Sequence, residues 1–203
     1  MIIYGASGHG LVIRDILTKA GHSDLKFVDD AEKINWIGGE VIKPQALSLE
    51  KNQEAILAVG NNLVRKKLAF SKDFRYQIGI HPSAILAIPK ESIGEGTVIM
   101  AGVIINPEVK IGRHVIVNTA ASIDHECYIE DFVHISPNAT LSGDVRVGEG
   151  THIGAGAVVI QGIRIGKWAT IGAGAVVIRD VPNCAVVVGN PAKIIKYNAA
   201  FDE

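Results

Sequence analysis

The chain has 203 residues, a net charge of −1 and 20% charged residues. This length suffices for the cores of one or two domains, and the balanced charge argues against a nucleic-acid or membrane-surface partner. No apolar run reaches the roughly 20 residues that cross a bilayer. Cys127 and Cys184 lie far apart in the sequence and match no metal-binding spacing. Together with the lack of a recognisable secretory signal, they indicate a reducing compartment. We therefore expect a soluble, cytoplasmic protein without membrane insertion.

Residues 1–80 are predicted to form a small Rossmann-like α/β domain. Short apolar runs that read as strands alternate with glycine turns and helical stretches. Such units build a parallel sheet whose ligand crevice lies at the carboxyl ends of its strands. The strands are expected at residues 1–4, 25–28 and 55–59, and the first helix at residues 11–19.

The first strand is followed by a glycine-rich loop. Gly5, Gly8 and Gly10 follow the spacing G-x-x-G-x-G, which differs from the dinucleotide fingerprint G-x-G-x-x-G, so NAD is not the expected ligand. Main-chain N–H groups of this loop and of the helix start are placed to hold phosphate. A plain tight turn is the alternative interpretation.

Polar residues follow the other two strands. Asp29 and Asp30 come after the second strand, and Gly60 comes after the third. Carboxyl ends of parallel strands share one edge of the sheet, so these residues are expected beside the glycine-rich loop. The two aspartates are also typical of a strand-end cap, and the run Arg65-Lys66-Lys67 is typical of a solvated helix face.

Residues 81–203 are predicted to form a second, all-β domain, because a six-residue period begins at Ile93. Fifteen consecutive positions spaced six residues apart, from Ile93 to Val177, hold Ile, Leu or Val. A period of six indicates a parallel β-helix, a triangular prism in which each hexad supplies one wall. Residues 93–182 would make five coils of eighteen residues, stacked about 4.8 Å apart.

The second place of each hexad is expected to form the turn with a positive φ. Glycine, asparagine and aspartate tolerate that conformation at low cost. These types occupy the second place at Gly94, Asn106, Gly112, Asn118, Asp124, Gly148, Gly154, Gly166 and Gly172.

The most reactive group of side chains in the repeat is Asp124-His125-Glu126. His125 holds the third hexad place and is expected to point outward at a corner. A histidine beside a carboxylate suits general-base catalysis at neutral pH. One coil later, about 5 Å away, Gly143 could offer its N–H to an oxyanion. Cys127 holds an inward place and is expected in the core.

The motifs together resemble the hexapeptide-repeat acyltransferases, and among them the UDP-amino-sugar acetyltransferases of bacterial bacillosamine synthesis, which are related to sialic acid O-acetyltransferases. The resemblance covers essentially the whole chain. It implies a left-handed β-helix, a homotrimer, and an active site between two prisms. The motifs are Tyr4 to Gly10, Asp29-Asp30, Gly60-Asn61-Asn62, Asn118-Thr119, His125-Glu126-Cys127, His134 and the run from Val188 to Lys193.

The resemblance also implies roles for single residues. His125 would be the general base and Glu126 would raise its basicity, while Asn118 would help at the acceptor. The UDP-sugar would contact Ser7, Gly8, His9, Asp29, Asp30 and Gly60. Acetyl-CoA would contact His134, the turn residues Ala155 and Ala173, and Lys193 near its phosphates. His114 and His152 carry no motif and are expected at the surface, which is also the alternative for His134.

The leading hypothesis is N-acetylation, by acetyl-CoA, of the 4-amino group of a UDP-4-amino-4,6-dideoxy sugar, with no metal. O-acetylation of a sugar such as sialic acid needs the same base and stays open. A metal hydratase resembling γ-class carbonic anhydrases, with His134 and His152 as ligands, and a non-catalytic sugar-nucleotide sensor are further alternatives.

Overall fold

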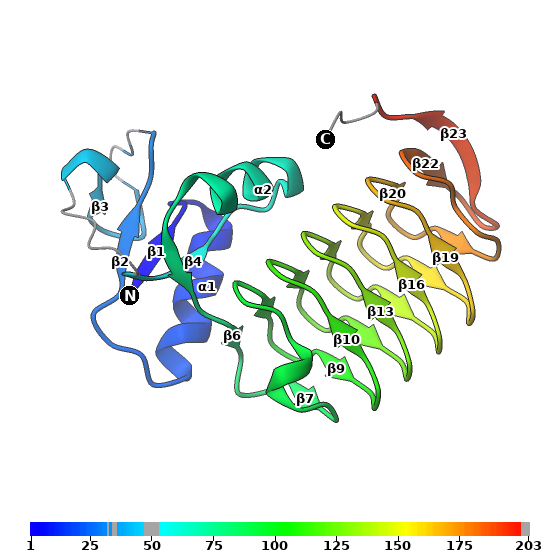
Figure 1. Ribbon diagram of the computed structural model, residues 1–203, viewed down its shortest axis with the longest axis horizontal. Coiled ribbons are helices and arrows are strands. Elements are labelled where there is room, and N and C mark those ends of the chain that lie inside the picture. The colour runs from blue at the N-terminus through cyan, green and yellow to red at the C-terminus, as the bar shows by residue number, and fades with distance from the viewer. Residues whose placement is uncertain (32, 34–35, 47–52, 200–203) are drawn as a thin grey trace.

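The computed structural model describes residues 1–31, 33, 36–46 and 53–199. It has an α/β domain at the N-terminus, followed by a column of stacked triangular coils (Figure 1). The expected fold class, a Rossmann-like domain followed by a parallel β-helix, is confirmed. No helix among the described residues is long and apolar enough to span a membrane.

The N-terminal domain is a five-stranded parallel sheet in the order β3-β2-β1-β4-β5. The chain leaves β1 through helix α1 toward β2, and leaves β4 through helix α2 toward β5. The strand order therefore reverses between β1 and β4, the point at which parallel sheets open a ligand crevice. The elements are β1 (Ile2–Tyr4), α1 (Gly8–Lys19), β2 (Lys26–Val28), β3 (Val41–Ile42), the 3-10 helix η1 (Pro44–Ala46), β4 (Gln53–Leu57), α2 (Asn62–Ser71) and β5 (Phe74–Tyr76).

The column has three parallel faces, with one antiparallel hairpin at its C-terminal end. The first face contains β6 (Gly79–Ile80), β8 (Val98–Ile99), β11 (Ile116–Val117), β14 (His134–Ile135), β17 (His152–Ile153), β20 (Thr170–Ile171), β22 (Ala185–Val188) and β23 (Lys193–Tyr197). The second face contains β7 (Ile85–Leu86), β9 (Ile104–Ile105), β12 (Ser122–Ile123), β15 (Thr140–Leu141), β18 (Val158–Val159) and β21 (Val176–Val177). The third face contains β10 (Lys110–Ile111), β13 (Tyr128–Ile129), β16 (Arg146–Val147) and β19 (Arg164–Ile165), and the 3-10 helix η2 (Lys90–Ser92) precedes β8.

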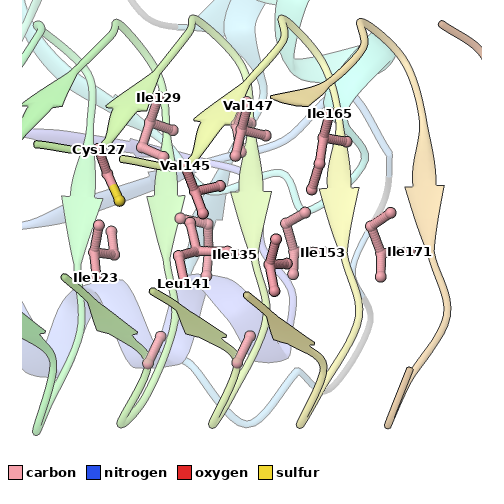
Figure 2. Close-up of a cluster of buried hydrophobic side chains, with 14 of the residues drawn as sticks. Ile123, Cys127, Ile129, Ile135, Leu141, Val145, Val147, Ile153, Ile165 and Ile171 are labelled. Carbon is pink, nitrogen blue, oxygen red and sulfur yellow. The ribbon is translucent and has the colours of Figure 1, made fainter. Parts of the chain in front are cut away.

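The aliphatic ladder of the sequence fills the inside of the column. Strands pair in parallel with an offset of eighteen residues, so that Ile123 lies beside Leu141 and Ile129 beside Val147. Figure 2 shows these side chains stacked in rows between the faces, with Cys127 among them. Cys127 is buried, as expected, and burial raises the pKa of its thiol to about 11, which suits a core residue better than a nucleophile.

The prediction of positive φ at the second hexad place is wrong. The left-handed residues fall at the fourth place, where Glu126 has φ 61° and Gly150 has φ 67°. The second-place glycines serve another purpose: a Cβ on Gly94 would lie 2.5 Å from the backbone nitrogen of Arg113 in the next coil. These glycines therefore permit adjacent coils to approach closely, and do not supply a special backbone conformation.

The N-terminal domain packs on the first face of the column. Ile13 and Ile16 of α1 share one hydrophobic cluster with the outward-facing Val98 and Ile116. The helix α2 lies at the third corner, where the third face turns into the first, since Asn62 donates hydrogen bonds to the carbonyls of Gly150 and Thr151. The two domains thus bury part of the first face between them.

The residues 65–67 do not form the solvated helix face that the sequence suggests. Lys67 is exposed, and Lys66 forms an ion pair with Glu149 at 2.5 Å. Arg65, however, is only 1% exposed. The buried residues of α2 are Asn62 and Arg65, so the buried part of its contact with the column is polar, and hydrophobic periodicity gives no sign of it.

Candidate active site

The glycine-rich loop lies at the crevice edge of the sheet. Ser7 caps α1 by accepting a hydrogen bond from the N–H of Gly10, and Gly8 is the first helical residue. Both Ser7 and Gly8 are exposed. The unpaired N–H groups of a helix start attract anions, so this loop offers a phosphate site.

The loops after β1 and β4 touch each other. The N–H of Ala58 donates to the carbonyl of Tyr4 at 2.7 Å, and a Cβ on Gly5 would lie 2.6 Å from the carbonyl oxygen of Ala58. Gly5 has φ +121°, so only glycine fits both the conformation and the space. Exposed Gly60 therefore lies at the same edge as Ser7 and Gly8.

Asp29 and Asp30 support this loop from the neighbouring strand. The carboxylate of Asp29 accepts hydrogen bonds from the N–H groups of Ala6 and Ala31, both at 2.8 Å. Asp30 accepts a hydrogen bond from the Tyr4 hydroxyl at 2.7 Å; burial and this carboxylate raise the pKa of that phenol. At least one oxygen of each aspartate thus holds the local backbone or a side chain, so Asp29 acts as a strand-end cap.

Two imidazoles meet where the N-terminal domain covers the first face. His9 Nε2 and His134 Nδ1 are buried and have no hydrogen-bond partner among the described residues. Burial lowers the pKa of His9 to about 4 and that of His134 to about 3, and the nearby His9 ring adds to the lowering at His134. Asn118 Nδ2 lies 3.1 Å from His134 Nε2. His9, His134 and Asn118 therefore form one polar cluster between the two domains, in which both imidazoles are neutral at pH 7.

His114 and His152 are not the surface residues that the sequence suggests. His114 is 4% exposed and stacks on Phe132 with ring centroids 5.3 Å apart. His152 is half-buried, lies 4.8 Å from the His134 ring and is 3.0 Å from Ser136 Oγ. The N-terminal domain packs on the first face, to which His134 and His152 belong. Hexad position alone does not reveal this contact.

The histidine–carboxylate pair lies at the second corner, between the second and third faces. His125 Nδ1 is 2.9 Å from Glu126 Oε2, and both side chains are more than half exposed. Asp124 accepts the His125 N–H at 2.8 Å and the Asn106 amide at 2.7 Å, and these two bonds lower the pKa of its carboxyl. Glu126 therefore orients the ring and leaves Nε2 to face outward.

Gly143 lies directly against this ring, one coil further along. A Cβ on Gly143 would lie 2.6 Å from His125 Nε2. In the described part of the chain, the Gly143 N–H has no acceptor, whereas the next N–H, that of Asp144, donates to the His125 carbonyl. A free N–H beside an exposed imidazole is the arrangement that the oxyanion role requires.

The remaining expected contacts lie on the first corner, between the first and second faces. Ala155 and Ala173 are exposed turn residues one coil apart, since the N–H of Gly174 donates to the Ala155 carbonyl. Lys193 is exposed at the start of β23, next to Val188. The two alanines therefore form an exposed line parallel to the column axis.

A single chain does not bring all of the expected residues together. Asn118 follows β11 and so lies on the first corner, together with Ala155 and Ala173. His125, Glu126 and Gly143 follow strands of the second face and lie on the second corner. The whole second face separates His125 from Asn118. Among the described residues, no group of three or more His, Cys, Asp and Glu side chains is arranged to hold a metal ion.

A hexapeptide column with an outward histidine–glutamate pair, joined to an α/β domain with a glycine-rich loop at the carboxyl ends of its strands, is typical of a hexapeptide-repeat acyltransferase of the nucleotide-sugar type. Comparisons with known proteins agree. The model of the PglD N-terminal domain matches residues 1–71. The model of the bacterial transferase hexapeptide (six repeats) matches residues 126–161 and 144–179.

Solved structures match over nearly the whole chain. The acetyltransferase domain of PglB from Neisseria gonorrhoeae, in complex with acetyl coenzyme A, is 38% identical with a TM-score of 0.89, over 96% of this chain and 98% of that one. PerB from Caulobacter crescentus, in complex with CoA and GDP-perosamine, is 36% identical with a TM-score of 0.87, over 96% of each chain. This chain therefore belongs to the family of hexapeptide-repeat sugar acetyltransferases with a PglD-type N-terminal domain.

A curated relative is the UDP-N-acetylbacillosamine N-acetyltransferase of Bacillus subtilis. It is 45% identical over 110 residues, which cover 49% of this chain and 50% of that protein. The match thus spans about half the length of this relative. Its activity and substrate are therefore a basis for a proposal about this chain.

Proposed function

We propose that this chain is an acetyl-CoA-dependent N-acetyltransferase that acts on the 4-amino group of a UDP-4-amino-4,6-dideoxy-N-acetylhexosamine. The observation that carries the proposal is the exposed His125–Glu126 pair with the Gly143 N–H beside it. The relatives support the substrate class: one is named for UDP-N-acetylbacillosamine, and PerB binds CoA and GDP-perosamine. No named relative among them is an O-acetyltransferase, so N-acetylation is favoured.

The proposed reaction is direct attack of the amine on the thioester. The amine nitrogen forms a bond to the acetyl carbonyl carbon, and His125 Nε2 takes the proton that the nitrogen loses. Glu126 stabilises the imidazolium that results, and the Gly143 N–H donates to the oxyanion. The carbon–sulfur bond then breaks, and the thiolate of CoA receives the proton.

The separation of the two corners supports an assembly in which neighbouring copies complete each site. We infer a homotrimer in which the second corner of one column faces the first corner of the next. His125 of one copy would then meet an acceptor held by Asn118 and His134 of its neighbour, with the pantetheine along Ala155 and Ala173. Symmetric closed assemblies of this kind are the usual state of homo-oligomers.

The cell compartment belongs to the same proposal. Cys127 and Cys184 are free thiols, as is usual in a reducing compartment. We infer that the enzyme works in the cytoplasm.

The test follows free thiol while the protein is incubated with acetyl-CoA and one acceptor at a time. The acceptors are the UDP-4-amino-4,6-dideoxy sugar, GDP-perosamine and sialic acid, each at equal concentration. We expect rapid thiol release with the UDP-amino sugar and an acetylated amine in the product. Thiol release only with sialic acid would make the enzyme an O-acetyltransferase. If none of the three acceptors gave thiol release, the acetyltransferase function would be refuted.

A further inference from the structure

Arg65 joins the N-terminal domain to three places on the column. Its Nε donates to the carbonyl of His114 at 2.8 Å, and its Nη2 donates to the carbonyls of Phe132 at 2.8 Å and Val133 at 3.5 Å. His114 and Phe132 are equivalent residues of successive coils at the third corner. A planar guanidinium can span two stacked coils in this way, and a lysine ammonium cannot.

The same guanidinium also holds the loop that carries Gly60. Its Nη1 donates to the carbonyls of Val59 at 2.9 Å and Gly60 at 3.3 Å, and its Nη2 donates to Asn62 Oδ1 at 2.9 Å. Gly60 lies at the crevice edge beside the glycine-rich loop. Arg65 thus fixes one wall of the nucleotide crevice directly to the coil that carries His134.

The charge of Arg65 has no counter-ion within the described structure, since every acceptor of its hydrogen bonds is a neutral oxygen. Burial lowers its pKa to about 9, so the group stays cationic at neutral pH. Burying an unpaired charge is costly. A buried group with a perturbed pKa is therefore a candidate for a role at a functional site.

The imidazoles of His9, His134 and His152 lie within the electrostatic influence of this cation. Burial is the largest cause that lowers the pKa of each of these rings, and the charge of Arg65 lowers it further. These imidazoles are therefore neutral at pH 7, and they are placed to donate or accept hydrogen bonds. A buried positive charge beside neutral hydrogen-bond donors suits a diphosphate, because its oxygens are negatively charged and accept hydrogen bonds.

We propose that Arg65 is a positioning residue that both fixes the Gly60 loop to the column and supplies the buried positive charge to which the diphosphate of a nucleotide sugar is attracted. This proposal rests on the crevice being the nucleotide site. It goes beyond that function because it assigns the electrostatic attraction to a residue that no substrate needs to touch.

Three variants separate the two tasks. Arg65→Gln keeps hydrogen-bonding capacity and removes the charge, whereas Arg65→Lys keeps the charge and loses the planar fork. Lys67→Gln removes an exposed charge from the same helix and is the matched control. Folding of each variant is checked by far-UV circular dichroism, and Arg65→Lys remains informative if Arg65→Gln does not fold.

The first readout is binding of uridine, UMP and UDP by calorimetry. For Arg65→Gln we expect UDP to bind on the order of tenfold more weakly, with uridine affinity within about twofold of the unmodified protein. Arg65→Lys should keep the preference for UDP over uridine, and Lys67→Gln should match the unmodified protein. Equal losses for uridine and UDP in Arg65→Gln would overturn the electrostatic task.

The second readout needs no ligand, so it separates this proposal from the nucleotide function. Carbon-13 NMR titration follows His9, His134 and His152, on which Arg65 and the neighbouring rings act. In Arg65→Gln these residues should gain protons at higher pH, and in Arg65→Lys the amides of residues 59–61 should exchange faster. Unchanged titration and exchange would refute both tasks. Failure of the unmodified protein to bind any nucleotide would refute the nucleotide site and the attraction of a diphosphate, but not the fixing of the Gly60 loop, which the exchange of residues 59–61 measures.

Discussion

Gly143 and His125 are in direct contact across one coil of the column: a Cβ added to Gly143 would lie 2.5 Å from Cε1 of the imidazole ring. The ring therefore rests on the Gly143 backbone, and Glu126 holds its other side through Nδ1. This contact fixes the direction of Nε2 and keeps it beside the Gly143 N–H. Activity should depend strongly on the absence of a side chain at this position.

The first prediction concerns Gly143→Ala. The backbone of Gly143 lies outside the left-handed region, so alanine costs little stability, but its methyl group must push the exposed ring aside. We expect kcat to fall by about tenfold to a hundredfold, because misplacing a catalytic group by about 1 Å has that effect. Thiol-release kinetics and thermal unfolding check this.

The matched control for that variant is Gly21→Ala. Gly21 has φ +90° and open space around it, so alanine there should cost about 1 kcal/mol of stability and leave kcat unchanged. A Gly143→Ala protein with normal kcat would show that the ring does not need this position.

The second prediction concerns His125→Ala. Removing a general base typically lowers the rate by about 10²- to 10⁴-fold, and the exposed ring contributes little to folding. We expect kcat to fall within that range, with the thermal midpoint unchanged. His22→Ala, which removes an exposed imidazole from the N-terminal domain, should behave as the unmodified protein. Full activity in His125→Ala would assign the proton transfer to another group.

The third prediction tests whether each site spans two copies. His125→Ala and Asn118→Ala alter opposite sides of the proposed site, so each alone should be nearly inactive. Co-expressed with different affinity tags and purified through both, mixed assemblies should recover activity. In a trimer that carries both tags, about one site in three would hold both intact residues, because only one of its three neighbour pairs joins the two variants in the right order. If the mixture stays as inactive as the single variants, each site belongs to one chain.

The fourth prediction concerns acid stability and His114. Burial lowers the pKa of this ring to about 4, below the value near 6.5 of an unfolded histidine. Below pH 6.5 the unfolded chain therefore binds more protons than the folded one, so stability falls as the pH drops from 6.5 to 4. The contribution of His114 to this loss is up to about 3 kcal/mol.

His114→Asn removes the titrating group and suits a position with φ 52°, because asparagine tolerates the left-handed region. Urea unfolding at pH 7 and pH 5, at one protein concentration, measures the loss. We expect the variant to be less stable at pH 7, where the stacking on Phe132 is gone, but to lose less stability between the two pH values. An equal loss would mean that His114 is accessible to protons in the folded state.

The sequence by itself determined the column and the direction of its side chains. A period of six on three faces places Ile123 and Ile129 inside and leaves His125 outside, because each wall repeats the same alternation. The same spacing placed Gly143 beside His125, since one coil is one repeat of eighteen residues. Local glycine and helix signals were likewise enough to predict that a glycine-rich loop leads from the first strand into a helix.

Only the tertiary structure decided which outward positions are covered. His114, His152 and Arg65 look like surface residues in the sequence, because hydrophobic periodicity carries no information about a polar contact between domains. The role of the second-place glycines also depends on the tertiary structure, since they leave space for the backbone of the next coil. The closed coil also places Asn118 and His125 on different corners, a separation that depends on how three faces meet in space.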